Sequence, residues 1–263
     1  MTAILRHELK LNFKSLLIWS LSVGIMGFIC ILMYTSMEGE MADMAETFSN
    51  LGAFSEAFGM STLSIATISG FFATEVGAVH GLGSAMFAAL MATVLLSKEE
   101  DGHTGEFLYS LPVSRSSVVV AKILALISEL VLFTLICGAF YAAGFIALGE
   151  NIPGSEMTAF LLRMLMMNIE IAAVALVISA ASARNRIGFG LGLSLIFYAY
   201  DLVGRVVPDM KDWLFLGPFS LANASEIFAG YELPGKAVVT AILVTGVSLA
   251  AVFGIYLKKD LAA

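Results

Sequence analysis

The chain has 263 residues, of which 59% are hydrophobic and only 13% are charged, and its formal net charge is −7. Soluble domains carry roughly a quarter charged residues, so this chain has about half of the charge that a soluble surface needs. The composition therefore excludes an ordinary soluble protein and indicates an all-α integral membrane protein, counted in spans of about 20 residues. The negative charge argues against nucleic acid as a partner.

The N-terminal residues 1–14 have apolar side chains near helical spacing, with basic side chains between them. This pattern predicts an amphipathic helix that lies in the membrane interface; a frayed tail is the alternative. The apolar run that follows is too long for a cleavable signal and no small-residue cleavage site follows it. Cys30 and Cys137 both lie in apolar runs, and their spacing indicates neither a metal site nor a disulfide framework.

Residues 15–36 form the first predicted span. The next segment, 37–75, holds six acidic residues and no Lys or Arg, and its apolar residues recur every three or four positions. We expect one or two amphipathic helices here, resting on the outer leaflet. A lysine-free acidic segment is what the positive-inside rule permits outside the cell.

Five further apolar runs are each long enough to form a transmembrane span. Residues 208–236, which contain three prolines, are expected to form a second external segment. No internal repeat of the kind found in two-half transporters is evident. The sequence therefore predicts one transmembrane domain over residues 1–263 with six spans. The spans after the first are expected at 76–97, 118–148, 158–182, 187–207 and 237–257.

The distribution of basic residues predicts that both termini are cytoplasmic. Placing the termini, 98–122 and 183–186 inside puts ten of the fourteen Lys and Arg residues there, which is the bias that the positive-inside rule describes. Arg163 and Arg205 fit less well and must snorkel or pair. Arg205 follows Asp201 by four residues, so a helix-face ion pair is expected. The ten inner residues are Arg6, Lys10, Lys14, Lys98, Arg115, Lys122, Arg184, Arg186, Lys258 and Lys259.

Motifs for catalysis and nucleotide binding are missing from the sequence. Gly235-Lys236 is followed by Ala237, so there is no phosphate-binding loop of the G-x-x-x-x-G-K-[ST] type. No metalloprotease or nucleophile-elbow motif occurs, and the three histidines are scattered, so we expect no catalytic residue, no metal site and no enzyme activity. An intramembrane hydrolase would need a nucleophile or metal set that the sequence does not show.

Two acidic residues lie inside predicted spans: Glu129 in the third and Glu170 in the fourth. A carboxyl group in the bilayer is costly unless it is paired or hydrated, so each is a candidate functional site. Both could line a translocation path or couple to an ion. Equally, each could make a structural hydrogen bond to a serine, to Asn168 or to a partner subunit.

The longest dense run of charge, residues 98–122, separates the second and third spans. Its acidic start is followed by a short apolar stretch, Pro112 and a basic end. Asp101 or Thr104 can cap a short helix, and Glu106 near its start favours the positive end of the helix dipole.

That short helix would carry Phe107, Leu108 and Leu111 on one face and would end at the residue before Pro112. A water-exposed loop gains nothing from such a face. We therefore expect the helix to lie on lipid or to pack in a groove of another protein, with Arg115 and Lys122 marking the return to the membrane.

The run Asp101-Gly-His-Thr-Gly-Glu-Phe-Leu-Tyr-Ser-Leu-Pro-Val-Ser-Arg115, with the later Lys122, resembles the segment after the second span of type-2 ABC exporter permeases. His103 stands where many members have glycine. Ala57-Phe58-Gly59 and Gly70-Phe71-Phe72 resemble these permeases more weakly. The residues that match are Thr104, Glu106, Leu108, Pro112, Val113, Ser114, Arg115 and Lys122.

The resemblance implies a permease subunit of an ABC exporter in the cell membrane. Two permease subunits, identical or different, would enclose a pathway, and separate ATPase subunits would bind ATP and magnesium, with no cofactor on this chain. Residues 98–117 would be the coupling element. A non-transporting membrane anchor or assembly subunit that docks a cytoplasmic ATPase is the alternative, and the substrate stays open. The expected docking residues are Glu100, Asp101, Thr104, Glu106, Phe107, Leu108, Leu111, Pro112 and Arg115.

Overall fold

The computed structural model describes residues 1–105 and 112–259, apart from the side chains of residue 38 and residues 41–44. These residues are largely helical and contain no strand. Six helices in this part of the chain are long and apolar enough to cross a membrane, as the sequence predicts. They are Thr2–Met37 within α1 (Thr2–Ser49), Ile68–Leu95, α7 (Arg115–Leu148), α8 (Gly154–Ala181), α9 (Ile187–Val206) and α12 (Gly235–Tyr256).

The first helix differs from its predicted form. Residues 1–14 and the first span belong to one helix, α1, which has 48 residues. The expected boundary near residue 14 is absent because neither glycine nor proline occurs between Thr2 and Val23 to interrupt the helix. At 1.5 Å per residue α1 is about 72 Å long, more than twice the hydrocarbon thickness of about 30 Å. The interfacial position of residues 1–14 stays a prediction.

The second span also begins earlier than predicted. Helix α3 (Ile68–Phe71), a π-helical turn η1 (Phe72–Val76) and α4 (Gly77–Leu95) follow one another without a break. The 28 residues Ile68–Leu95 therefore form one continuous span. The remaining part of the predicted external segment 37–75 holds the end of α1 and the short helix α2 (Ala53–Phe58).

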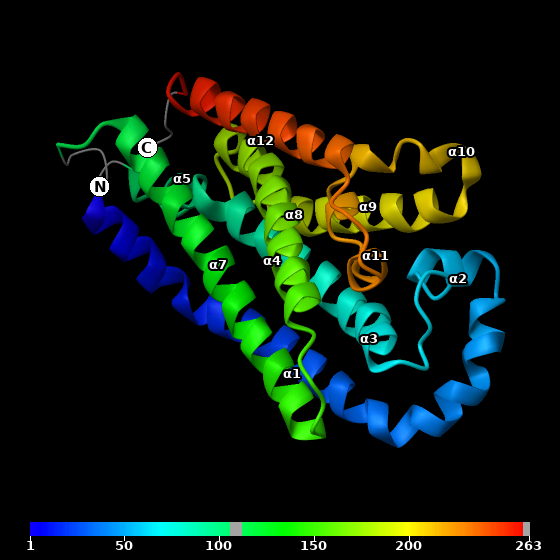
Figure 1. The fold of residues 1–263 in the computed structure, drawn as a ribbon. Helices are drawn as coiled ribbons and strands as arrows, with labels where there is room; N and C mark the ends of the chain where they lie inside the picture. Colours follow the sequence, from blue (N-terminus) through cyan, green and yellow to red (C-terminus); the bar gives the residue numbers. More distant parts are fainter. Residues whose placement is uncertain (106–111, 260–263) are drawn as a thin grey trace.

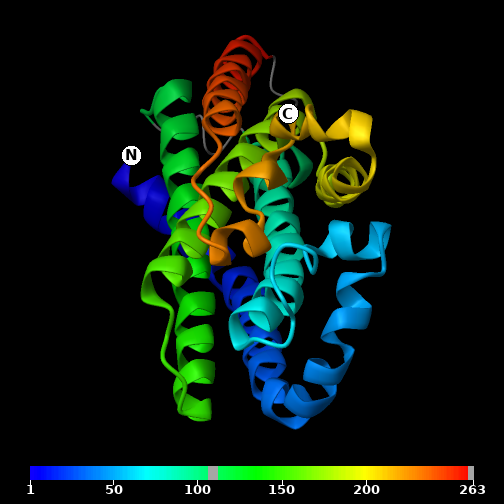
Figure 2. The ribbon, with the colours of Figure 1, turned by 45° about the vertical axis from the view of Figure 1, so that its right-hand side comes forward.

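Helix α4 lies at the centre of the bundle, between α1, α8 and α9 (Figures 1 and 2). The most apolar stretch of the span Ile68–Leu95, which ends with α4, is 61% buried, against 17% for that of α12. Helix α1 packs along α7, and glycines permit the close approach: a Cβ atom on Gly24 would lie 2.6 Å from the Phe140 ring. Gly144 of α7 is similarly close to Ile31.

An aromatic cluster fills the centre of the bundle around Phe72, which is 1% exposed. The Phe72 ring lies 5.0 to 5.7 Å, between ring centroids, from four other rings. Nearby, the His80 Nδ1 atom and the Tyr141 hydroxyl share a hydrogen bond of 2.8 Å. The other rings around Phe72 are Tyr141, Phe145, Phe160 and Phe228.

The two ends of the bundle differ in content. The N-terminus, the C-terminal end of α12 and α5 (Lys98–Asp101) lie at one end (Figure 1). The opposite end holds α2, α10 (Pro208–Lys211), α11 (Ala224–Phe228) and the 3-10 turns η2 (Leu214–Leu216) and η3 (Pro218–Leu221). We call these the terminal end and the far end.

The far end contains the predicted ion pair. Arg205 Nη2 lies 2.5 Å from Asp201 Oδ2, so the expected pairing along α9 is confirmed. Arg163 of α8, which also needed a partner, donates a hydrogen bond of 2.9 Å to the Tyr231 carbonyl oxygen.

Candidate functional site

The candidate site is the terminal end, where α5 begins directly after α4. Two backbone N–H groups at this junction, of Leu96 and Ser97, donate to the Ser179 hydroxyl of α8 at 2.9 and 3.1 Å. The Ser97 hydroxyl donates to Asn185 Oδ1, in the turn between α8 and α9, at 3.1 Å. Hydrogen bonds between uncharged groups therefore hold the start of α5 against α8 and against the turn that follows α8.

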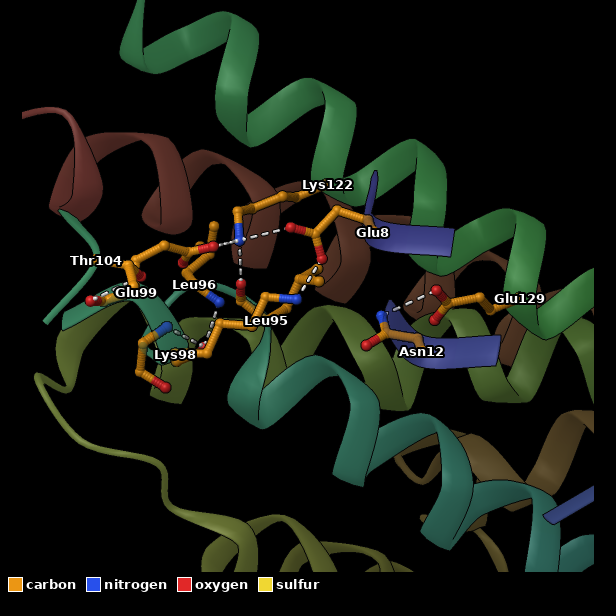
Figure 3. Close-up of polar contacts among 11 residues, drawn as sticks. Glu8, Asn12, Leu95, Leu96, Lys98, Glu99, Thr104, Lys122 and Glu129 are labelled. Carbon is orange, nitrogen blue, oxygen red and sulfur yellow. Dashed lines mark hydrogen bonds and ion pairs between the residues drawn. The ribbon is translucent and has the colours of Figure 1, made fainter. Parts of the chain in front are cut away.

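Lys122 of α7 reaches this junction and is 0% exposed. Its ammonium donates to the Leu95 carbonyl oxygen at 2.7 Å, donates to the Glu99 carboxylate and lies 3.1 Å from Glu8 Oε1 (Figure 3). All three N–H donors of the ammonium thus have an acceptor. Leu95 is the last residue of α4, so the cation also lies at the negative end of that helix dipole.

Glu8 of α1 joins the two lysines. One of its oxygens faces Lys122, the other accepts from Lys98, and the residue is only 2% exposed. Glu8, Lys98, Glu99 and Lys122, which we call the charged cluster, carry two positive and two negative charges, so their mutual attraction offsets part of the cost of desolvation. Glu99 Oε2 is buried without a hydrogen-bond partner among the described residues.

The C-terminal segment makes a second set of contacts with α5. Lys259 Nζ lies 2.5 Å from Glu100 Oε1 and donates to the Ser182 carbonyl oxygen at 2.7 Å. Arg115, at the start of α7, donates to the Lys259 carbonyl oxygen at 2.7 Å. Asp101 Oδ2 accepts from Asn185 Nδ2 at 2.8 Å. Helix α5 is therefore contacted by α1, α7, the turn after α8 and the C-terminal segment.

The predicted docking residues fall into two groups. Glu100 is buried in the contacts just described, whereas Asp101, Thr104, Pro112 and Arg115 are partly or wholly exposed at the terminal end. The Thr104 hydroxyl lies 3.4 Å from the Glu99 carbonyl oxygen. The capping of a short helix and its apolar face stay predictions, because the other predicted docking residues lie outside the described part of the chain. These are Glu106, Phe107, Leu108 and Leu111.

A surface hollow of about 510 Å³ lies beside the charged cluster. Its walls come from the first turns of α1, including Ile4, His7 and Leu11, and from Gly102 and Thr104 after α5. The hollow therefore joins the N-terminal helix to the predicted docking segment on one surface.

The two intramembrane acids have different surroundings. Glu129 Oε1 accepts a hydrogen bond of 2.9 Å from Asn12 of α1 (Figure 3), and Glu129 Oε2 is buried without a partner among the described residues. Glu170 is 4% exposed and makes no hydrogen bond or ion pair to the described residues. Asn168, considered as a partner for both, instead accepts from the Ser84 hydroxyl at 3.2 Å.

Sequence reasoning missed five members of the site: Glu8, Asn12, Ser179, Asn185 and Lys259. One signal pointed to the first, because Glu8 is the only acidic residue before residue 38 and lies inside a basic helix. Nothing local marks the others, since their partners are 77 to 159 residues away in the chain.

Comparison with known proteins identifies the family. A search of curated proteins gives no match. The family model described as ABC-2 family transporter protein matches residues 2–261. The chain therefore belongs to the ABC-2 transporter family, as a multi-pass membrane permease of an ABC transporter.

Proposed function

We propose that this chain is the permease subunit of an ABC exporter and that its terminal end receives the motion of an ATPase subunit. Two permease subunits form the pathway in the cell membrane. The chain binds no nucleotide and catalyses no reaction itself; ATP and magnesium belong to the partner. Family membership implies association with an ABC ATPase in general terms, and the coupling route through residues 98–117 is the specific part of the proposal.

The observation that carries the proposal is the way α5 is held. Its four residues are contacted by Glu8 of α1, Lys122 of α7, Asn185 after α8 and Lys259 near the C-terminus. Buried, mutually compensating charges resist separation, because parting them leaves uncompensated charge in a medium of low dielectric. A displacement of α5 by a docked ATPase would therefore move these elements together.

The basic residues and the fold support the proposed orientation. The N-terminus, α5 and the C-terminal end of α12 lie at the same end of the bundle. Four of the ten basic residues that the positive-inside rule assigns to the cytoplasm make their contacts there: Lys98, Arg115, Lys122 and Lys259. The proposed docking segment is then on the side where ATP is available. The far end, with α2 and α10, would face outward.

The test uses the permease together with its cognate ABC ATPase in liposomes. Leu108→Asp is expected to abolish copurification and the stimulation of ATP hydrolysis, because a carboxylate on the docking face must be desolvated to bind. Leu216→Asp is the matched control, since it makes the same change at an exposed position of the far end. Normal copurification and transport by the Leu108→Asp variant would refute the docking assignment.

The same experiment separates an exporter from a membrane anchor. An anchor would copurify with the ATPase but would neither raise its turnover nor move any compound across the liposome membrane. A panel of ions, cationic peptides and amphiphiles would then identify the substrate class of an active permease.

A further inference from the structure

The far end contains two adjoining cavities. The outer cavity, of about 350 Å³, lies between α9, α10, η2, α11 and the start of α12. The second cavity, of about 40 Å³, which we call the inner cavity, lies among the π-helical turn η1, α4, α9 and α11, with Ala57 and Phe58 of α2 in its wall. Asp201, Arg205 and Asn223 line both cavities, so the two spaces meet at the ion pair.

The inner cavity contains polar atoms without partners. Thr74, in η1, is 5% exposed, and its hydroxyl makes no hydrogen bond to the residues that the structure describes. The same holds for Arg205 Nε, although the Arg205 guanidinium pairs with Asp201 and lies 3.4 Å from the Ala57 carbonyl oxygen. Buried polar groups are normally satisfied, so each orphan needs an explanation. A π-helical turn in a helix often marks a functional position.

The orphaned groups specify part of a ligand. An arginine N–H can only donate, and a threonine hydroxyl can donate as well, so both suit an oxygen acceptor. One water molecule needs roughly 10–15 Å³ of cavity volume. The inner cavity therefore accommodates a group the size of about three waters, such as a carboxylate or the oxygens of a phosphate. Arginine is the side chain best suited to these oxyanions.

The outer cavity carries both signs of charge. Lys211 is paired with Glu56 of α2 at 2.9 Å, and Lys236 lies over the Phe215 ring, 5.8 Å from its centroid. Asp212 and Glu226 supply carboxylates in the same cavity. A ligand with a bare negative charge would meet these acids, whereas a ligand that also carries an ammonium would be attracted by them.

We propose that the two cavities bind a small zwitterionic group that carries an oxyanion and an ammonium. The oxyanion lies in the inner cavity against Thr74 and Arg205. The ammonium lies in the outer cavity near Glu226 and Asp212. The outer volume falls within the range of about 300–1,000 Å³ of small-molecule sites. A soluble aminoalkyl phosphate and the headgroup of a zwitterionic lipid share this chemistry.

The test measures binding to the full-length permease by calorimetry, with O-phosphoethanolamine, inorganic phosphate and ethanolamine as probes. Vesicles containing phosphatidylethanolamine or phosphatidylglycerol form the lipid arm. Thr74→Val removes the orphaned hydroxyl at nearly constant shape and is expected to weaken binding of the zwitterion about tenfold, the value of one hydrogen bond of about 1.4 kcal/mol. Its melting temperature should not fall, because the hydroxyl has no partner in the described protein.

Thr134→Val is the matched control. Thr134 is also a buried helical threonine, but its hydroxyl donates to the Leu130 carbonyl oxygen at 2.9 Å and it lines neither cavity. The Thr134→Val variant should bind the probes with the same affinity as the wild type. Glu226→Gln, at a half-buried position, is the second variant, and it should reduce the preference for O-phosphoethanolamine over phosphate.

Binding of O-phosphoethanolamine alone assigns a soluble ligand, and binding of phosphatidylethanolamine vesicles alone assigns a lipid; either result supports the site. The proposed site would be overturned if phosphate or ethanolamine bound as tightly as O-phosphoethanolamine. It would also be overturned if the Thr74→Val variant kept the wild-type affinity, or if no probe bound. The ATPase is not needed for this measurement, so failure here leaves the proposed function intact, and loss of coupling in the Leu108→Asp variant leaves this site intact.

Discussion

The terminal end and the far end of the bundle both contain buried charge, but they arrange it differently. At the terminal end, Glu8, Lys98 and Lys122 come from three separate helices and pair with one another, with the Leu95 carbonyl oxygen as a further acceptor. The buried atom of this cluster that lacks a hydrogen-bond partner among the described residues is an acceptor, Glu99 Oε2, and not a donor. At the far end, the Asp201–Arg205 pair lies within one helix, and polar atoms next to it have no partner in the described protein.

This difference indicates two kinds of site. Charges that pair across separate helices hold those helices in fixed relation, and the Lys122 ammonium has no N–H donor left for a ligand. Groups that retain an unused donor in a cavity can bind a ligand, and their burial makes a fitting acceptor more valuable. A coupling joint needs the first arrangement, and a binding site needs the second.

The largest expected effect comes from removing the cation at the centre of the charged cluster. Lys122→Met leaves Glu8 and Glu99 without their shared partner, so we expect a loss of about 3–5 kcal/mol in stability. Denaturant or detergent titration of the purified permease measures this loss. Lys98→Met is the control, because the Lys98 side chain is 20% exposed and Glu8 keeps Lys122 as a partner. Equal losses in the two variants would contradict the central role of Lys122.

Removing one hydroxyl group at each end of the bundle should have different effects on stability. Ser179→Ala strands two buried backbone N–H groups at the α4–α5 junction, so we expect a loss of about 1–3 kcal/mol. Thr74→Val at the far end strands no described group, so its stability should stay equal or rise slightly. The same titration compares both variants. A larger loss for Thr74→Val would show that its hydroxyl has a structural partner and would remove the ground for a binding site.

The smallest expected effect is a pH dependence at the far end. Burial raises the pKa of the Glu226 carboxyl above its usual value of 4.5, while Arg205 and Arg163 lower it and Asp201 raises it. A raised folded-state pKa means that this carboxyl adds stability at acidic pH, and the contribution is lost as pH rises through the folded-state pKa.

Glu226→Gln should therefore become more stable relative to the wild type as the pH rises from about 4 to about 7. Melting temperatures of the two proteins across this range measure the trend. Glu232→Gln, at an exposed position of the same segment, controls for the loss of one carboxylate. A constant difference between wild type and Glu226→Gln would contradict the assigned pKa direction.

Local patterns in the sequence predicted the parts of the fold that depend on local physics. The six spans follow from apolar runs, and the Asp201–Arg205 pair follows from a separation of four residues along a helix. The helix boundary expected near residue 14 is absent from the structure, because a change from basic to apolar composition does not end a helix when no glycine or proline intervenes.

The membrane class, the number of spans and the chemical character of residues 98–122 could thus be predicted from hydropathy and charge along the chain. Only the tertiary structure decided which charges meet there. Glu8 and Lys122 are separated by more than a hundred residues, and their contact depends on how α1 packs along α7. The cavities at Thr74 and Arg205 could not be predicted from the sequence either. Whether a donor lacks a hydrogen-bond partner depends on the residues packed around it, and helical periodicity gives no information about neighbours from distant parts of the chain.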